Sequence, residues 1–190
     1  MDTYNSKYYE PLEQMMAIRH QYMSKILRDH SGQDIYEFFK NKKILDLGCG
    51  TGEFLNNYYG MGAECSGIDI ENNFKIKNKI NFKLINIEAN KFLKNCKKKF
   101  DVIFLFEFLE HLEEQDKYQL FENLTKNLNK NAYIFISTLN KNLLSKYLAI
   151  DIAENLFKLL PKKTHDFNLF LSPSKFCLLY TSDAADEPSS

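Results

Sequence analysis

The sequence predicts an α/β fold in which a parallel β-sheet is flanked by helices. Five short apolar runs, each typical of a buried strand, alternate with segments of helical periodicity. Strands that alternate with helices build parallel sheets through right-handed crossovers. A glycine-rich turn (Gly48-Cys49-Gly50-Thr51-Gly52) follows the first run and provides the strand–turn–helix connection by which α/β domains bring backbone close to nucleotide-like ligands.

Two helical segments are expected before the sheet begins. Apolar residues recur with helical spacing over 7–29, and Gly32 ends this pattern. Ile35 to Phe39 then form a further helical turn. The first strand is expected at 43–47, where Ile44, Leu45 and Leu47 form a short apolar run.

The rest of the chain continues the alternation of strands and helices. Helical periodicity is expected over 52–59, 88–95, 116–128 and 142–160. Strands are expected over 63–68, 81–86, 100–105 and 133–137. The polar segment between the second and third strands is too short for a full helix.

Composition limits the functions that the chain can have. The length of 190 residues is that of one domain, and the hydrophobic content of 44% is typical of a globular protein. The net charge of zero argues against general nucleic-acid binding. The four cysteines form no C-x-x-C pair, which indicates neither a zinc site nor a disulfide framework and favours a reducing compartment. We find no signal peptide and no run of 18 apolar residues.

Two acidic residues accompany the glycine turn. Its G-x-G-x-G spacing is neither the G-x-G-x-x-G of dinucleotide binding nor a P-loop, and no lysine follows it to hold a phosphate. Asp46 lies at the end of the first strand, and Asp69 follows the second strand, 21 residues after Gly48, where doubly wound folds place the carboxylate that binds ribose hydroxyls. These residues could also belong to an ordinary βα turn that binds no ligand. The pattern predicts a nucleoside site without a pyrophosphate, and it resembles motif I of the class I S-adenosylmethionine (SAM) methyltransferases, whose fold is Rossmann-like.

A cluster of ionisable residues follows the fourth strand. If a helix begins near Glu107, then Glu107, Glu110 and His111 share one face, where they could hold a hard divalent ion. The alternative is that the two acids are solvated near a helix N-terminus and complement its dipole. His111 could also act as a general base without a metal.

Two further polar segments are expected near the same rim of the sheet. Ser137-Thr138-Leu139-Asn140-Lys141 follows the fifth strand. Later in the chain His165 stands beside Asp166. Taken alone, His165 could be either a loop histidine with a satisfied hydrogen bond or a catalytic group.

Together these motifs resemble the ubiquinone-biosynthesis O-methyltransferase family. The matching segments, in order, are DLGCGTGE, GIDI, FDVIFLFEFLEHL, FISTLNKNLLSKYLA and PKKTHDFNLFLSPSKF. The resemblance extends from about Pro11 to Phe176. It implies a class I methyltransferase that methylates a phenolic hydroxyl of a polyprenylated benzenoid, with SAM as the methyl donor.

The resemblance also implies roles for individual residues. It implies SAM contacts at Arg19, Gly48, Asp69 and Phe106, and we add Asp46, Gly50 and Gly52 of the motif I segment. It implies a magnesium ion held by Glu107, Glu110 and His111. We expect His111 or His165 to take the proton of the phenol.

The substrate implied by the resemblance is lipid-soluble, so we expect the protein to associate peripherally with a membrane. We expect the cytoplasm, or the matrix face of the mitochondrial inner membrane, and contacts with other ubiquinone-biosynthesis enzymes. The helix at 142–160 has an apolar side that either faces the core or contacts the membrane. Two functional alternatives are a methyltransferase of another small molecule and a SAM-binding module without turnover.

The last residues of the sequence do not fit this pattern. Residues 177–187 read CLLYTSDAADE, which resembles a translated sequencing adapter. We therefore expect a methyltransferase domain at 1–176, without the last strands of the family's sheet, and a non-native tail at 177–190. The strand at 133–137 would then be an open apolar edge. We therefore expect this form of the chain to be poorly soluble or inactive, with a disordered tail, and the intact gene product to be an active enzyme.

Overall fold

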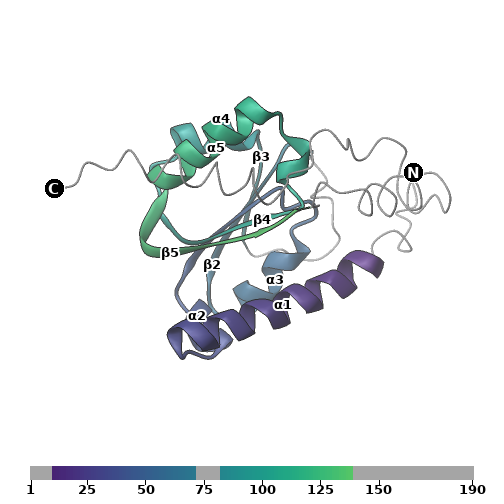
Figure 1. Cartoon of the computed structure of the whole chain (residues 1–190), viewed down its shortest axis with the longest axis vertical. Coiled ribbons are helices and arrows are strands. Elements are labelled where there is room, and N and C mark those ends of the chain that lie inside the picture. Colours follow the sequence, from purple (N-terminus) through teal and green to yellow (C-terminus); the bar gives the residue numbers. More distant parts are fainter. Residues whose placement is uncertain (1–9, 72–81, 139–190) are drawn as a thin grey trace.

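A parallel sheet forms the centre of the molecule. The structure is a computed structural model that describes residues 10–71 and 82–138. In this part of the chain the strand order is β3-β2-β1-β4-β5, and every neighbouring pair is parallel (Figure 1). The strands are β1 (Lys43–Leu47), β2 (Glu64–Asp69), β3 (Lys83–Asn86), β4 (Phe100–Phe106) and β5 (Leu128–Ser137).

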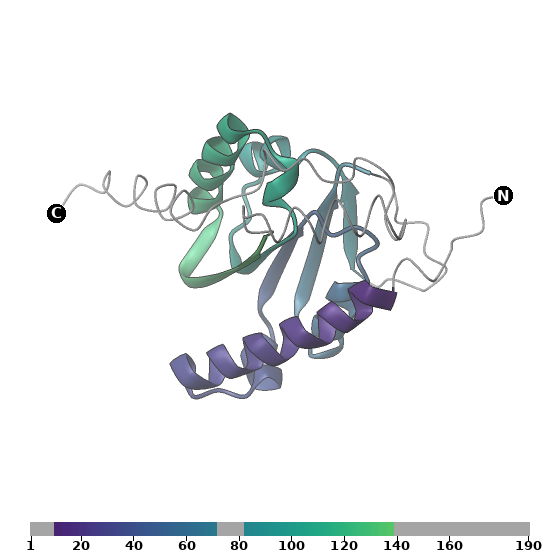
Figure 2. The ribbon, with the colours of Figure 1, turned by 45° about the vertical axis from the view of Figure 1, so that its right-hand side comes forward.

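Helices cover both faces of this sheet. One face carries α1 (Glu10–Ser31), α2 (Ile35–Phe39) and α3 (Glu53–Gly60). The opposite face carries α4 (Ala89–Asn95) and α5 (Glu114–Lys126). Figures 1 and 2 show the two layers on either side of the strands. The predicted α/β class with a Rossmann-like arrangement is therefore confirmed.

Strand β4 illustrates how the sequence produces two cores. Side chains alternate between the faces of a strand, and a strand that is covered on both faces reads as a continuous apolar run. Val102 and Phe104 belong to the core beneath α1, α2 and α3. Ile103 and Leu105 belong to the core beneath α4 and α5. All four side chains are fully buried.

Aromatic rings fasten α3 to the sheet. Phe54 and Tyr58 of α3 both pack on Phe104, with ring centroids 5.4 and 5.2 Å apart. Phe54 also meets Phe106 edge to face at 5.2 Å. Such aromatic pairs add roughly 0.5–1.5 kcal/mol each beyond the area they bury. Because α3 begins directly after the glycine turn, this packing also fixes the position of the turn.

The strand order defines where a ligand can enter. The chain builds outward from β1 to β3 on one side and from β4 to β5 on the other. The order therefore reverses between β1 and β4, and open α/β sheets bind ligands at the carboxyl ends of the strands at such a point. Glu107 and Gly48 directly follow these two strands.

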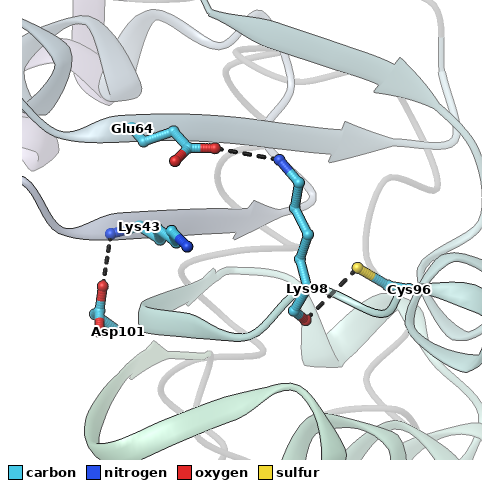
Figure 3. Close-up of polar contacts among 5 residues, drawn as sticks. All are labelled: Lys43, Glu64, Cys96, Lys98 and Asp101. Carbon is cyan, nitrogen blue, oxygen red and sulfur yellow. Dashed lines mark hydrogen bonds and ion pairs between the residues drawn. The ribbon is translucent and has the colours of Figure 1, made fainter.

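The opposite end of the sheet carries structural contacts (Figure 3). The backbone N–H of Lys43 donates to Asp101 Oδ2 at 2.8 Å and joins the beginnings of β1 and β4. Lys98 Nζ lies 3.2 Å from Glu64 Oε1, but both side chains are more than half exposed. An exposed pair of this kind contributes only about 0–1 kcal/mol.

The predicted elements are confirmed to within a few residues over the described part, with one extension. Strand β5 begins at Leu128 rather than near Tyr133. The register shifts between the pairs Phe100–Leu128 and Val102–Tyr133. Asn131 has φ +62° in this irregular stretch, a conformation that Asn tolerates better than most residues. The segments 142–160 and 177–190 lie outside the described residues.

Disulfide bonds and membrane-spanning helices can be assessed for the described residues only. Cys49, Cys65 and Cys96 are free thiols. Neither α1 nor another helix of the described part combines the length and the apolar character needed to cross a bilayer.

Candidate active site

A cavity of about 450 Å³ lies at the carboxyl ends of the strands. This volume falls within the range of small-molecule sites, roughly 300–1,000 Å³. Its wall combines the glycine turn, the ends of β2 and β4, and the start of α4. The lining residues are Gly48, Gly50, Ile68, Asp69, Ile70, Glu71, Ile87, Glu88, Ala89, Glu107, Phe108, His111 and Leu112.

The glycine turn has a conformation that requires glycine. Gly48, Gly50 and Gly52 have φ values of +76°, +53° and +79°, which side chains with a Cβ rarely adopt. A Cβ added to Gly48 would lie 2.6 Å from Cδ2 of Phe108. The backbone N–H groups of Gly48 and Cys49 both donate to the carbonyl of Ile68, at 2.8 and 3.0 Å. These hydrogen bonds connect the turn to β2, and the turn lines the cavity at Gly48 and Gly50.

Asp69 holds this turn through its carboxylate. The backbone N–H of Gly50 donates to Oδ2 at 2.7 Å, and that of Glu71 donates to Oδ1 at 2.8 Å. Each carboxylate oxygen can accept more than one hydrogen bond. Asp69 is partly exposed and lines the cavity, so it can still accept hydrogen bonds from a ligand.

Asp46 occupies a different environment from Asp69. It is 4% exposed and is not part of the cavity wall. Burial raises the pKa of Asp46 to about 7, and the charge of Asp69 adds to the rise while Arg19 opposes it. Asp46 therefore lies behind the site rather than in it.

Arg19 of α1 is partly buried and lies close to several acidic side chains. Its guanidinium forms an ion pair with Glu107 and lies over the ring of Phe106, 4.9 Å from the ring centroid. Burial lowers the pKa of Arg19, while the charges of Asp46 and Glu110 act in the opposite direction. Like Asp46, neither Arg19 nor Phe106 lines the cavity. Gly52, which begins α3, also lies outside its wall.

The segment after β4 differs from the sequence prediction. Glu107, Glu110 and His111 would share one face only if a helix began near Glu107, and no α-helix begins there. Glu107 has φ +45°, which is incompatible with a right-handed helix. A single turn of 3₁₀ helix, Leu109–His111, follows it. A contact with a distant segment explains the absence of a helix at Glu107. The Glu107 backbone N–H donates to the carbonyl of Ser137 at 2.9 Å and extends the β4–β5 pairing by one residue.

The three residues do not fit a magnesium ion in this arrangement. Among the described residues no group of three acidic, histidine or cysteine side chains is placed to hold a metal. Glu107 pairs with Arg19, and Glu110, which is 1% exposed, accepts a hydrogen bond from Thr138. His111 is exposed. A metal site from these residues remains a prediction from the sequence.

The two predicted proton acceptors can be compared only in part. His111 lines the cavity, and its backbone N–H donates to the carbonyl of Phe108 at 3.1 Å. His165 lies outside the described residues. Of the predicted site residues, the cavity wall therefore contains Gly48, Gly50, Asp69, Glu107 and His111.

The sequence reasoning missed several wall residues. Ile70 is 72% exposed. It lines the cavity directly after Asp69, and its place next to the predicted ribose acid is the signal that could have found it. Ile87 and Glu88 come from the β3–α4 connection, where Glu88 caps α4 by accepting from the backbone N–H groups of Asn90 and Lys91. Phe108 gives no local signal, because its role depends on the close approach of Gly48.

Comparison with known proteins agrees with this geometry. Residues 16–184 match a family model described as a methyltransferase domain. The ubiquinone biosynthesis O-methyltransferase of Pelagibacter ubique is 37% identical over 177 residues, which cover 88% of this chain and 71% of that protein. The chain belongs to the ubiquinone biosynthesis O-methyltransferase family. The enzyme of the same name from Aliivibrio fischeri is 28% identical over 94% of this chain and 75% of its own length.

Solved structures support the fold of this family member. A SAM-dependent methyltransferase from Archaeoglobus fulgidus superimposes with a TM-score of 0.63 at 23% identity, covering 92% of this chain and 73% of that one. The plantazolicin methyltransferase BpumL, in complex with a monoazolic desmethylPZN analogue and SAH, gives a TM-score of 0.67 at 20% identity, covering 95% and 69%. The chain is a SAM-dependent methyltransferase of the class I fold.

Proposed function

We propose that this methyltransferase transfers the methyl group of SAM to a phenolic hydroxyl of a polyprenylated benzenoid in ubiquinone biosynthesis. The names of its curated relatives support this substrate class. The observation that carries the proposal is the cavity at the end of the sheet, where Asp69, the glycine turn and His111 lie in one wall. In our proposal these groups would form the cofactor site and supply the proton acceptor in one place.

The wall residues fit the parts of SAM. Asp69 would accept hydrogen bonds from the ribose hydroxyls, and the turn at Gly48 and Gly50 lets backbone approach the methionine part of the cofactor. Ile70 and Ile87 offer apolar surface for the adenine ring. The other predicted cofactor residues, Arg19, Asp46, Gly52 and Phe106, would act from behind this wall by fixing its shape.

The reaction needs a deprotonated phenol in line with the methyl group. SAM supplies an electrophilic methyl group on its sulfonium. A phenol has a pKa of about 10, by analogy with tyrosine, so a base must accept its proton at neutral pH. We assign this role to His111 because it lines the cavity, with His165 as the alternative from the sequence. Alignment of oxygen and methyl in the cavity would supply much of the remaining acceleration.

The substrate class implies contact with a lipid surface. A polyprenyl tail is apolar, so we propose peripheral binding to a membrane, with other ubiquinone-biosynthesis enzymes as possible neighbours in the cytoplasm or at the inner mitochondrial membrane. The predicted amphipathic helix at 142–160 is our candidate for this contact and lies outside the described residues. Flotation with anionic vesicles tests it, and complete separation of protein from vesicles contradicts it.

Calorimetry and turnover assays test the function. We expect the intact protein to bind SAM and to methylate a polyprenyl catechol faster than it methylates a soluble catechol. Equal or better turnover of soluble acceptors would favour a methyltransferase of another small molecule. SAM binding without turnover on any acceptor would favour a non-catalytic module. The described arrangement of Glu107, Glu110 and His111 does not fit a magnesium ion. Turnover that persists in excess chelator would agree with this, whereas loss of turnover would favour the metal site predicted from the sequence.

A further inference from the structure

Two consecutive hydroxyl side chains at the end of β5 bind the two acidic side chains that follow β4. Ser137 Oγ donates to Glu107 Oε1 at 2.7 Å, and Thr138 Oγ1 donates to Glu110 Oε2 at 3.0 Å. The parallel register places Ser137 opposite Phe106, so the polar ends of both strands meet. We propose that Ser137 and Thr138 are positioning residues for methyl transfer, which act through Glu107 and through the turn that carries Glu110 and His111.

Glu107 is held on three sides. Its backbone N–H donates to the carbonyl of Ser137, one carboxylate oxygen accepts from the Ser137 hydroxyl, and the carboxylate also pairs with Arg19. A non-glycine residue at φ +45° is strained, and these contacts keep it in place. Because Glu107 lines the cavity proposed for SAM, the hydroxyl of Ser137 and the guanidinium of Arg19 together fix where its carboxylate lies.

Glu110 depends on Thr138 more strongly than its single contact suggests. Its carboxylate is almost fully buried, and within the described part of the chain Oε1 has no hydrogen-bond partner. A buried carboxylate that loses its hydrogen-bond donor is destabilised in place and moves toward solvent. His111 is the next residue in the same 3₁₀ turn and lines the cavity. A shift of Glu110 would therefore displace the histidine that we assign as base.

The proposed roles of Ser137 and Thr138 predict different effects, one on SAM affinity and the other on kcat. Ser137→Ala keeps the backbone hydrogen bond to Glu107 but removes the hydroxyl, and we expect SAM affinity to fall about tenfold. Thr138→Val keeps the shape of the side chain but removes the donor to Glu110, and we expect kcat to fall about tenfold with SAM affinity nearly unchanged. Thr138→Ser restores a hydroxyl and should recover most of the lost kcat.

Matched controls come from hydroxyls that bond to helix carbonyls away from the cavity. Ser31 Oγ donates to the carbonyl of Leu27 at 2.6 Å, and Thr125 Oγ1 donates to that of Glu122 at 2.8 Å. Ser31→Ala and Thr125→Val should leave SAM affinity and kcat at the wild-type values. All variants are compared as full chains at equal folded fraction, measured by circular dichroism.

The turnover readout rests on the proposed function, whereas the affinity readout does not. Calorimetry with SAM alone decides the role of Ser137: wild-type affinity in Ser137→Ala overturns it. Wild-type kcat in Thr138→Val, or failure of Thr138→Ser to recover turnover, overturns the role of Thr138. If the wild type binds SAM but methylates no catechol, the proposed function is wrong, and the affinity of Ser137→Ala then decides the present proposal.

Discussion

The carboxylate of Asp69 accepts a hydrogen bond from the backbone N–H of Gly50, with 2.7 Å between Oδ2 and the nitrogen. This contact joins the end of β2 to the middle of the glycine turn after β1. The acid that the sequence assigns to ribose binding therefore also organises the loop beside the cofactor. A ligand that meets Asp69 finds both the carboxylate and the turn already in place, which lowers the ordering cost of binding.

We expect Asp69→Ala to weaken SAM binding by about 1.5–3 kcal/mol, the range for hydrogen bonds to a charged group. The variant removes the proposed ribose contact and also leaves the N–H groups of Gly50 and Glu71 without their acceptor. Calorimetry with SAM measures the loss. Unchanged affinity would remove Asp69 from the ribose role.

Asp69→Asn serves as a control for these two effects. Its side-chain oxygen can still accept from one of the two backbone N–H groups, so the turn should be disturbed less than in the alanine variant. We expect an intermediate loss of affinity and a smaller loss of thermal stability. An asparagine variant that binds SAM no better than the alanine variant would assign the whole effect to the negative charge.

Gly48→Ala should destabilise the fold by about 2–4 kcal/mol, from a left-handed backbone conformation and from overpacking against Phe108. The added Cβ would lie 2.6 Å from the Phe108 ring, and both residues line the cavity. Chemical denaturation measures the change. Gly60→Ala is the control, because Gly60 ends α3 with open space at its Cβ position, and this variant should be as stable as the wild type or slightly more stable.

The strands and most helices could be predicted because their signals are local. Strand β4 is a continuous apolar run, and the sheet that results is covered on both faces, as such runs require. Asp69 could be placed because parallel strands end at one edge of the sheet, and the structure puts its carboxylate at the glycine turn. The family's motifs then identified the chemistry.

The conformation of Glu107 could not be predicted from its neighbours in sequence. A helix beginning near Glu107, had it formed, would have placed three potential metal ligands on one face. The left-handed backbone at Glu107 is stabilised instead by Ser137, 30 residues later, and by Arg19 of α1. Similarly, Phe108 becomes a wall residue only because Gly48 leaves space for its ring. Contacts between distant segments override local preference at this point.

Asn127→Ala should destabilise the fold by about 2–3 kcal/mol, because two carbonyl groups would lose their donor. Asn127 is 1% exposed, and its Nδ2 donates to the carbonyls of Cys96 and Lys98, at 2.9 and 3.0 Å. These bonds hold the connection between α4 and β4. The midpoint of urea unfolding measures the loss.

A second asparagine provides the control for Asn127. Asn95 Nδ2 also donates to a backbone carbonyl, that of Lys91, at 2.7 Å, but the contact is exposed. Water can replace an exposed donor, so Asn95→Ala should change the free energy of unfolding by less than about 0.5 kcal/mol. Equal losses in both variants would contradict the role assigned to burial.

The raised pKa of Asp46 predicts how the stability of the ligand-free protein depends on pH. Burial raises its pKa from 3.8 to about 7 in the folded protein, so between these values the folded state binds more protons than the unfolded state. Its contribution to stability is therefore fully present below about pH 4, declines as the pH rises to about 7, and changes little above that. Asp46→Asn has a similar shape and cannot titrate. We expect its free energy of unfolding to exceed that of the wild type by an amount that grows between pH 5 and pH 8, on the order of a few kcal/mol at most. Denaturation of both proteins at several pH values measures this difference. A difference that stays constant with pH would contradict the raised pKa of Asp46.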